Sequence, residues 1–576
     1  MSLIKTCLSR IVGWTVLATA GNVSAEVTFS GLDGAQEANA RVVMPLASTE
    51  CTSPRWRVER LFRDADKDLH SALEALGYYD VDISKSLSFD DACWRASFNL
   101  TVGEPVVLGS VGVEIVGAAA ADTEFVSLIE ANKPTAGTIL NHGRYEAYKT
   151  TLLSTAIARG YFDAEFLRSE VTVTPEKYSA DVQLALTSGS RYRFGEINYT
   201  EGILRSNLMR GFSDIRSGDF YQSKAISDLY EVLNGSTYFG AVSIRTDPLD
   251  REQKTVPVNV VLQPGTRRIY SIGAGFTTDT GPNGRLGYAN RRRNDKGHQF
   301  ESKLFASSVR SELTASYRWP RRDPRKEWFN TVLGVQHEDT DTSESDTFKI
   351  GIQRSRSVGE SWLETRYLDY TYEDFAVGDQ DTTTELVILG INWESARGRE
   401  VSRVTNGWRL SFDLQGASDN LGSDTSFGQF NFTTKWIHSF SEKTRVIARG
   451  SAGVTAKEGL SELPVSVRFF AGGDRSVRGY DYKTLGPVDQ DGLVIGGSNL
   501  LEGSLEIDYL LRPRWAVAAF VDSGSAFNNS DVDFSTGAGL GLRWYSPVGP
   551  IRLDLAHPLD DPDQDVRVHI SLGLDL

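Results

Sequence analysis

The chain has 576 residues, with 61 Lys and Arg against 76 Asp and Glu and a formal net charge of −15 at pH 7. This acidic balance argues against a nucleic acid partner, because phosphates are bound by basic patches. Beyond residue 25 there is no run of eighteen apolar residues, so the sequence predicts no membrane-spanning helix.

The first 25 residues have the pattern of a secretory signal. Lys5 and Arg10 supply the positive start, residues 11–20 a short apolar core, and residues 23–25 (VSA) a small-residue cleavage site. We therefore expect residues 1–25 to be a signal peptide and the rest of the chain to be exported.

Two cysteines, Cys51 and Cys93, remain once Cys7 has left with the signal. Export places them in an oxidising compartment, which predicts one disulfide. Such a bond closes a loop of about 40 residues and stabilises its domain by roughly 4 kcal/mol in the chain-entropy model. The alternative is two separate buried thiols.

The region from residue 26 to residue 266 repeats one pattern three times. A helical apolar pattern leads into a short corner, at residues 77–80 (GYYD), 160–163 (GYFD) and 237–240 (TYFG), and strand-like runs follow. The leading tyrosines lie 83 and then 77 residues apart, a spacing that indicates small domains rather than a solenoid.

The repeat length, the order strand–helices–strand–strand and the corner resemble POTRA domains, the periplasmic modules of outer-membrane assembly factors. We place the three units at residues 26–103, 104–189 and 190–266. Three generic α/β sandwiches are the alternative. The resemblance implies exposed strand edges that take up an extended segment of another chain.

From residue 267 the sequence takes on the pattern of a transmembrane β-barrel. Segments of about ten residues alternate apolar and polar side chains between Gly, Asn, Asp and Ser breaks. The last segment is the clearest, with Val566, Val568 and Ile570 alternating with Arg567 and His569. A soluble all-β sandwich is the alternative, and the repeated alternation after a signal peptide disfavours it.

We expect sixteen barrel strands between residues 267 and 576, an even number that leaves both ends of the barrel in the periplasm. The predicted strands are 269–277, 285–293, 299–307, 312–319, 328–337, 347–356, 362–372, 385–394, 408–417, 427–438, 445–455, 500–511, 515–524, 535–545, 551–557 and 566–576. The predicted fold is thus α+β periplasmic POTRA repeats followed by a 16-stranded antiparallel transmembrane β-barrel in the bacterial outer membrane.

The longest connection, residues 456–499, follows the eleventh strand and is extracellular by parity. We expect it to fold back into the lumen. It contains Val477-Arg478-Gly479-Tyr480, which resembles the [VI]-R-G-[FY] signature of the outer-membrane assembly-factor superfamily that includes BamA, TamA and the two-partner-secretion exporters. Residues 520–524 (FVDSG) and 541–550 (GLRWYSPVGP) match two further motifs of that superfamily. The whole pattern is most similar to the TamA branch.

The motif arginine is expected to anchor the loop. Strand alternation points Glu506 and Asp522 into the lumen, and the guanidinium fork of Arg478 suits bidentate pairing with a carboxylate. The resemblance implies the same contacts, because in the family the motif arginine meets these two carboxylates. Gly479 allows close backbone approach, and Tyr480 packs on the inner wall. The alternative is a surface arginine on a mobile loop.

A lateral gate is expected where the first and last strands meet. Gly273 and Gly275 in the first strand and Gly573 in the last offer no side chains to pack. A seam with few cross-strand pairs opens more readily than the other strand pairs.

The resemblance implies a factor that assembles and inserts autotransporters and other barrel proteins, through POTRA docking and the lateral gate. The implied partners are a TamB-like inner-membrane-anchored periplasmic protein, client outer-membrane proteins and outer-membrane lipid. The alternatives are a two-partner-secretion exporter that threads a client through the barrel, and a lipid-transfer conduit with a TamB-like partner. The POTRA-like repeats and the plug-like loop disfavour a passive porin.

The chain carries no G-x-S-x-G, H-E-x-x-H or phosphate-loop motif, and its seven histidines lack metal-ligand spacing. We therefore expect no enzymatic activity, no metal and no cofactor.

Overall fold

The structure is a computed structural model that describes residues 25–90, 93–359, 361–398, 403–457, 460–528, 532–546, 549–560 and 565–572. Except for Ala25, the expected signal peptide lies outside these residues, as does Gly573. None of the described helices is both long and apolar enough to cross a membrane.

Three small sheets of three strands each are formed by the N-terminal part of the chain, ordered β1-β3-β2, β4-β6-β5 and β7-β9-β8. In the first two sheets the middle strand runs parallel to the first strand and antiparallel to the other. The elements are β1 (Glu26–Ser30), α1 (Gly34–Val43), α2 (Arg55–Glu74), β2 (Val81–Phe89), β3 (Trp94–Val102), β4 (Val107–Val116), α3 (Thr123–Asn132), α4 (His142–Ala158), β5 (Glu165–Thr174), β6 (Ser179–Thr187), β7 (Arg193–Tyr199), α5 (Ser206–Met209), α6 (Ser223–Asn234), β8 (Phe239–Arg245) and β9 (Thr255–Pro264). Each flanking strand therefore has one edge that pairs with no other described strand.

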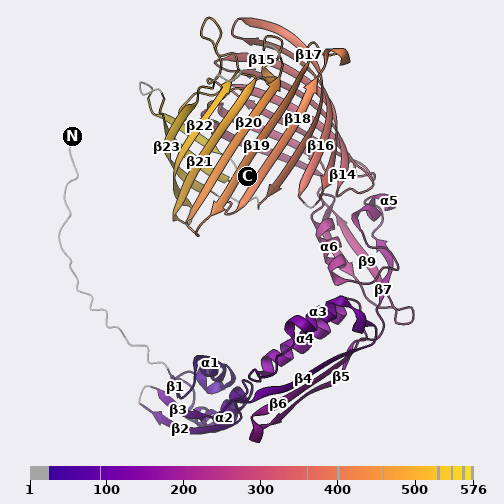
Figure 1. Cartoon of the computed structure of the whole chain (residues 1–576), viewed down its shortest axis with the longest axis vertical. Helices are drawn as coiled ribbons and strands as arrows, with labels where there is room; N and C mark the ends of the chain where they lie inside the picture. The colour runs from indigo at the N-terminus through magenta and orange to yellow at the C-terminus, as the bar shows by residue number, and fades with distance from the viewer. Residues whose placement is uncertain are drawn as a thin grey trace, which may run out of the picture. The chain divides into compact units, whose positions relative to one another are not determined.

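The first unit shows how the sequence builds these sheets. Alternate residues of β3 are buried, from Trp94 to Leu100, because successive side chains of a strand point to opposite faces. Helix α2 supplies the other side of the core with residues at helical spacing, Val58, Ala65, Leu69, Ala72 and Leu73. Figure 1 shows α1 and α2 beside this sheet. The predicted Cys51–Cys93 disulfide is present and joins the segment before α2 to the segment before β3.

The aromatic corners also connect neighbouring units, a role that the sequence did not reveal. Tyr78 packs against the core of the first unit, whereas Tyr79, the next residue, packs against the core of the second. The Tyr79 hydroxyl lies 2.7 Å from His142 Nε2, at the start of α4. The first corner is therefore a joint as well as part of a core.

The second and third corners make analogous joints. Phe162 packs against Tyr192 and Tyr221, with ring centroids 5.3 and 5.0 Å apart. In the third corner the Tyr238 hydroxyl donates to the carbonyl of Gly297, at 2.6 Å, in the turn between the second and third barrel strands. The last repeat is thereby attached to the barrel itself.

A second attachment involves the turn after the fourth barrel strand. Arg325 donates to Asp214 at 2.8 and 2.9 Å and to the neighbouring Asp323 at 2.7 Å. The hydrogen bond from Arg325 holds the pKa of Asp214 below its ordinary value. The basic turn of residues 321–326 is thus a contact with the last repeat.

The barrel is one sheet of sixteen antiparallel strands in chain order from β10 to β25, as the sequence predicted, and Figure 1 shows its strands side by side. The strands are β10 (Arg268–Thr277), β11 (Gly281–Asn290), β12 (Gln299–Ser307), β13 (Arg310–Pro320), β14 (Glu327–Asp339), β15 (Ser343–Val358), β16 (Trp362–Val377), β17 (Gln380–Arg397), β18 (Gly407–Ala417), β19 (Phe427–Ser439), β20 (Thr444–Ala456), β21 (Asn499–Arg512), β22 (Trp515–Phe527), β23 (Ser535–Ser546), β24 (Gly549–Pro558) and β25 (Arg567–Leu572). Strands β15 to β17 run to 16, 16 and 18 residues, longer than expected. The buried side chains Phe375 and Val377 of β16 and Leu386 of β17 pack against the long loop.

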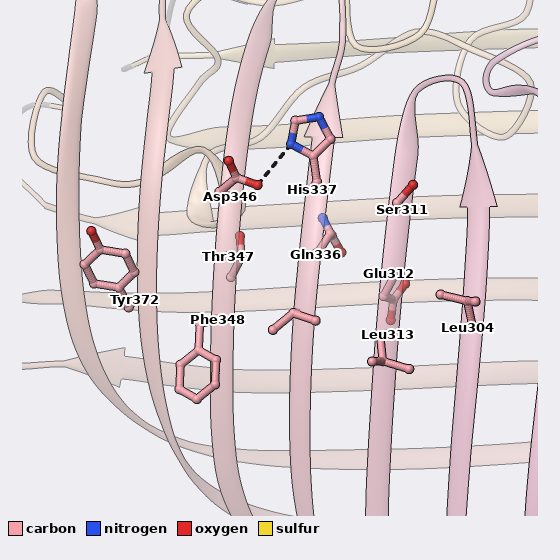
Figure 2. A pocket seen from close by; sticks show the side chains of 11 residues that line it. Leu304, Ser311, Glu312, Leu313, Gln336, His337, Asp346, Thr347, Phe348 and Tyr372 are labelled. Atoms are coloured by element: carbon pink, nitrogen blue, oxygen red, sulfur yellow. Dashed lines mark hydrogen bonds and ion pairs between the residues drawn. The ribbon is translucent and has the colours of Figure 1, made fainter.

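The outer wall of the barrel carries the apolar band that a membrane requires. Figure 2 shows Leu304, Leu313 and Phe348 at one level of neighbouring strands, and His337 and Asp346 above them. His337 Nδ1 lies 3.0 Å from an oxygen of Asp346. By strand parity this polar pair marks the extracellular border of the band.

Replacing Cys51 and Cys93 by serine is expected to lower the stability of the first unit by about 4 kcal/mol, because the unfolded chain loses a cross-link. Hydrogen exchange of the β3 amides in the full-length protein measures this loss, and the β6 amides of the second unit are the internal control. Equal acceleration in both strands would contradict a local role for the bond.

Candidate functional site

Arg478 of the long loop is buried against the inner face of the barrel wall, where it contacts three carboxylates. Its Nε and Nη2 donate to the two oxygens of Asp522 at 2.6 and 2.9 Å. Its Nη1 donates to Glu506 at 2.9 Å and to Asp554 at 3.0 Å. The guanidinium carbon also lies 3.4 Å from the centre of the Phe520 ring. The structure thus brings Arg478 together with both carboxylates expected from the sequence.

Three members of this cluster were not singled out from the sequence. Asp554 accepts from both Arg478 and Arg543, and Arg543 also donates to Glu506 at 2.9 Å. Arg449 lies 3.6 Å from Asp522. For Asp554 the sequence did contain an indication. It lies between the exposed Leu553 and Leu555 of β24, so strand alternation points it to the inner face.

The neighbouring strands β20 to β24 position the cluster, and glycines of β23 leave space for it. A side chain at Gly537 would place its Cβ within 1.8 Å of the Arg478 carbonyl, and one at Gly541 would meet Asp554 and Arg543. The loop backbone therefore lies against β23 at a distance that only glycine permits.

The other motif residues hold the loop backbone in place. Gly479 has a φ of +106°, which L side chains rarely adopt, and its Cβ position faces the backbone of His557 and Pro558. Val477 and Tyr480 are buried. The four motif residues are thus packed inside the barrel.

Contacts along the rest of the loop reach the opposite wall. Lys483 Nζ lies 2.5 Å from Glu338 of β14, and the Ser466 amide donates to Glu373 of β16 at 3.1 Å. Residues 460–498 are therefore bound to both sides of the lumen and obstruct it.

Few hydrogen bonds between described residues join β10 to β25 at the seam. Within the described residues, the Thr278 amide donates to the Ile570 carbonyl at 3.2 Å, and the Ile570 amide donates to the Thr278 hydroxyl at 2.7 Å. This register sets Leu572, the last described residue of β25, opposite Phe276. Residues 268–275 of β10 consequently have no described partner on that side.

Exposure supports this view of the seam. Ile272 is 85% exposed, whereas Leu304 and Leu313 on interior strands are each 41% exposed, because strands on both sides cover them. Gly273 and Gly275 lie in the stretch of β10 that has no described partner. Gly573 is outside the described residues.

A second polar cluster, missed by the sequence, lies at the outer end of the seam. Asp279, Asp474 and His569 present ligand-type atoms within 4.8 Å of one another. Burial and the neighbouring Asp474 carboxylate raise the pKa of Asp279 to about 7. These residues come from a turn, the loop and the last strand, so sequence spacing gave no sign of the cluster.

Comparison with known proteins identifies the family. Residues 265–575 match the Omp85 superfamily domain, and residues 26–102 match the POTRA domain TamA domain 1. The chain belongs to the Omp85 superfamily. It is an outer-membrane protein with N-terminal POTRA domains in the periplasm.

The relatives are distant in sequence. The outer membrane protein assembly factor BamA of Nitratidesulfovibrio vulgaris is 23% identical over 423 residues, which are 70% of this chain and 53% of that protein. BamA of Neorickettsia risticii is 20% identical over 494 residues, 79% of this chain and 64% of that protein. The chain thus spans between half and two thirds of the length of these relatives.

The fold is also found among solved structures. BamA from Haemophilus ducreyi lacking POTRA domains 1–3 is 16% identical, with a TM-score of 0.67 over 81% of this chain and 99% of that chain. At this identity the likeness shows a shared fold.

Replacing Arg478 by alanine is expected to release the loop. It removes the guanidinium that donates to both oxygens of the buried Asp522, and breaking a buried pair in this way costs about 3–5 kcal/mol. Limited proteolysis of the protein in membranes, with cleavage mapped within residues 460–498, measures the release.

Arg475→Ala is the matched control, because Arg475 lies three residues away in the same loop and is exposed. An unchanged cleavage pattern in Arg478→Ala would contradict the anchoring role.

Proposed function

We propose that this protein assembles other outer-membrane proteins by admitting their strands at a lateral gate between β10 and β25. The POTRA sheets receive extended client segments, and the anchored loop keeps the lumen shut while the gate opens. Folding of the client supplies the driving force, and no catalytic group takes part.

The observation that carries this proposal is the edge of β10 at residues 268–275, which pairs with no strand among the described residues. In the hydrocarbon region an unsatisfied backbone N–H or C=O costs several kcal/mol. A client strand that pairs with residues 268–275 satisfies these groups by β-augmentation. The exposed apolar side chains Tyr270 and Ile272 give the same client strand a surface to pack on.

The anchored loop favours this lateral route over threading through the lumen. An exporter would have to displace Arg478 from three carboxylates, together with the contacts of Lys483 and Ser466 on the opposite wall. Lateral insertion leaves all of these contacts in place.

The periplasmic units supply the first binding step. Each sheet has its middle strand between two edges, so an edge strand such as β2 or β5 offers backbone groups to an extended client. The match of the first unit to a TamA-type POTRA domain supports a TamB-like partner at the inner membrane. Lipid transfer with such a partner is the other function compatible with this arrangement.

A disulfide across the seam is expected to abolish client insertion. Thr277 and Ser571 face each other in the register set by Thr278 and Ile570, so cysteines at these two positions lock β10 to β25. Insertion of a radiolabelled client barrel into proteoliposomes measures activity before and after reduction, and we expect reduction to restore it.

The control is a cysteine pair at Lys303 and Thr314, which face each other in the fully paired strands β12 and β13. This lock is expected to leave insertion unchanged. Full insertion by a completely locked seam would overturn the gate and favour threading through the lumen.

A further inference from the structure

The polar cluster at the outer end of the seam connects three separate segments. The Asp474 amide in the loop donates to both carboxylate oxygens of Asp279, at 2.9 and 3.1 Å, in the turn after β10. The Asp474 carboxylate lies 2.5 Å from Nδ1 of His569 in β25. The loop therefore contacts both sides of the seam through one residue.

The protonation of the His569 ring follows from its second contact. The Gly479 amide lies 3.0 Å from His569 Nε2, and a backbone N–H can only donate, so Nε2 carries the lone pair. In the neutral ring the proton is then on Nδ1 and is donated to Asp474. Since that nitrogen is occupied by its proton, hydrogen bonding rather than a bound cation explains the cluster.

Burial makes these contacts effective. Only 6% of each of the Asp474 and His569 side chains is exposed, and hydrogen bonds to an ionised group are about twice as strong as neutral ones. Weak competition from water strengthens them further.

The position of the cluster relates it to the seam. Asp279 directly follows Thr278, and His569 directly precedes Ile570. Among the described residues, Thr278 and Ile570 are the pair whose hydrogen bonds join the two sides of the seam. A further ion pair, between Asp481 of the loop and Arg567, ties the loop to β25. The loop thus spans the seam at the level where the two strands meet.

We propose that the bridge Asp279–Asp474–His569 acts as a latch. Through it the anchored loop holds the outer end of the seam closed. The latch makes opening of the β10–β25 seam depend on the position of the loop. This inference deepens the proposed function and rests on it for its biological meaning.

Residues 474–479 of the loop thus contact two different parts of the barrel. Arg478 binds β21, β22 and β24 and fixes the loop in the lumen. Asp474 and Gly479 bind the seam strand β25. A displacement of the loop would therefore act on the seam directly, without passing through the other strands.

Hydrogen exchange of the full chain in lipid nanodiscs, without any client, tests the latch. Asp279→Ala breaks the bridge on the β10 side, and His569→Phe breaks it on the β25 side while keeping an aromatic ring. We expect each variant to accelerate exchange of peptides containing Thr278 and Ile570 by about tenfold or more, with β12 and β13 unchanged as the folding control.

The double variant separates a bridge from two independent contacts. If the links act in series, breaking the second adds little, so the double variant exchanges no faster than the faster single one. Asp491→Ala, an exposed carboxylate in the same loop, is expected to have no effect. Asp474→Ala replaces His569→Phe if that variant fails to form a barrel.

Unchanged exchange at the seam in the single variants overturns the latch, as does a double variant whose effect is the product of the two. Acceleration of the wild-type seam by a chelator overturns the hydrogen-bonded bridge in favour of a cation. The exchange test contains no client, so its result does not depend on client insertion. If the variants accelerate exchange as expected but a fully locked seam still inserts clients, the proposed function is contradicted and the latch is not.

Discussion

The burial of one guanidinium constrains the whole C-terminal side of this barrel. Arg478 is 3% exposed, and a charge held away from water is tolerated only when it is paired and hydrogen-bonded. The pairing fixes Asp522, Glu506 and Asp554 on the inner face of their strands, and it requires glycine on β23 where the loop backbone passes. The register of these four strands and the path of the loop therefore depend on each other.

Strand pairing differs between the anchored side of the barrel and the seam. Strands β21 to β24 are paired over their length and share the buried ion cluster. Between β25 and β10 the described residues pair at Thr278 and Ile570, and the loop adds contacts to both sides of this seam. The proposed gate would open at this seam while the rest of the barrel stays folded, and the loop contacts both the buried ion cluster and the seam.

The periodic features of this protein could be predicted from the sequence, and its contacts between segments could not. Two-residue alternation gave sixteen strands and the inward direction of Glu506 and Asp522, because a strand has only two faces. Asp279 and His569 lie 290 residues apart, so their meeting depends on barrel closure and loop path. The corner residues Tyr79 and Tyr238 contact the unit that follows their own, and these contacts depend on how the units join, which a repeat pattern does not show.

The central claim is that clients meet the edge of β10, and site-specific photo-crosslinking during insertion tests it most directly. A photoreactive residue at Ile272 probes the seam, and one at Leu313, also outward-facing, probes an interior strand at the lipid boundary. The account predicts client adducts at Ile272 and none at Leu313 while insertion is in progress. Equal adducts at both positions, or adducts only from residues inside the lumen, would contradict it.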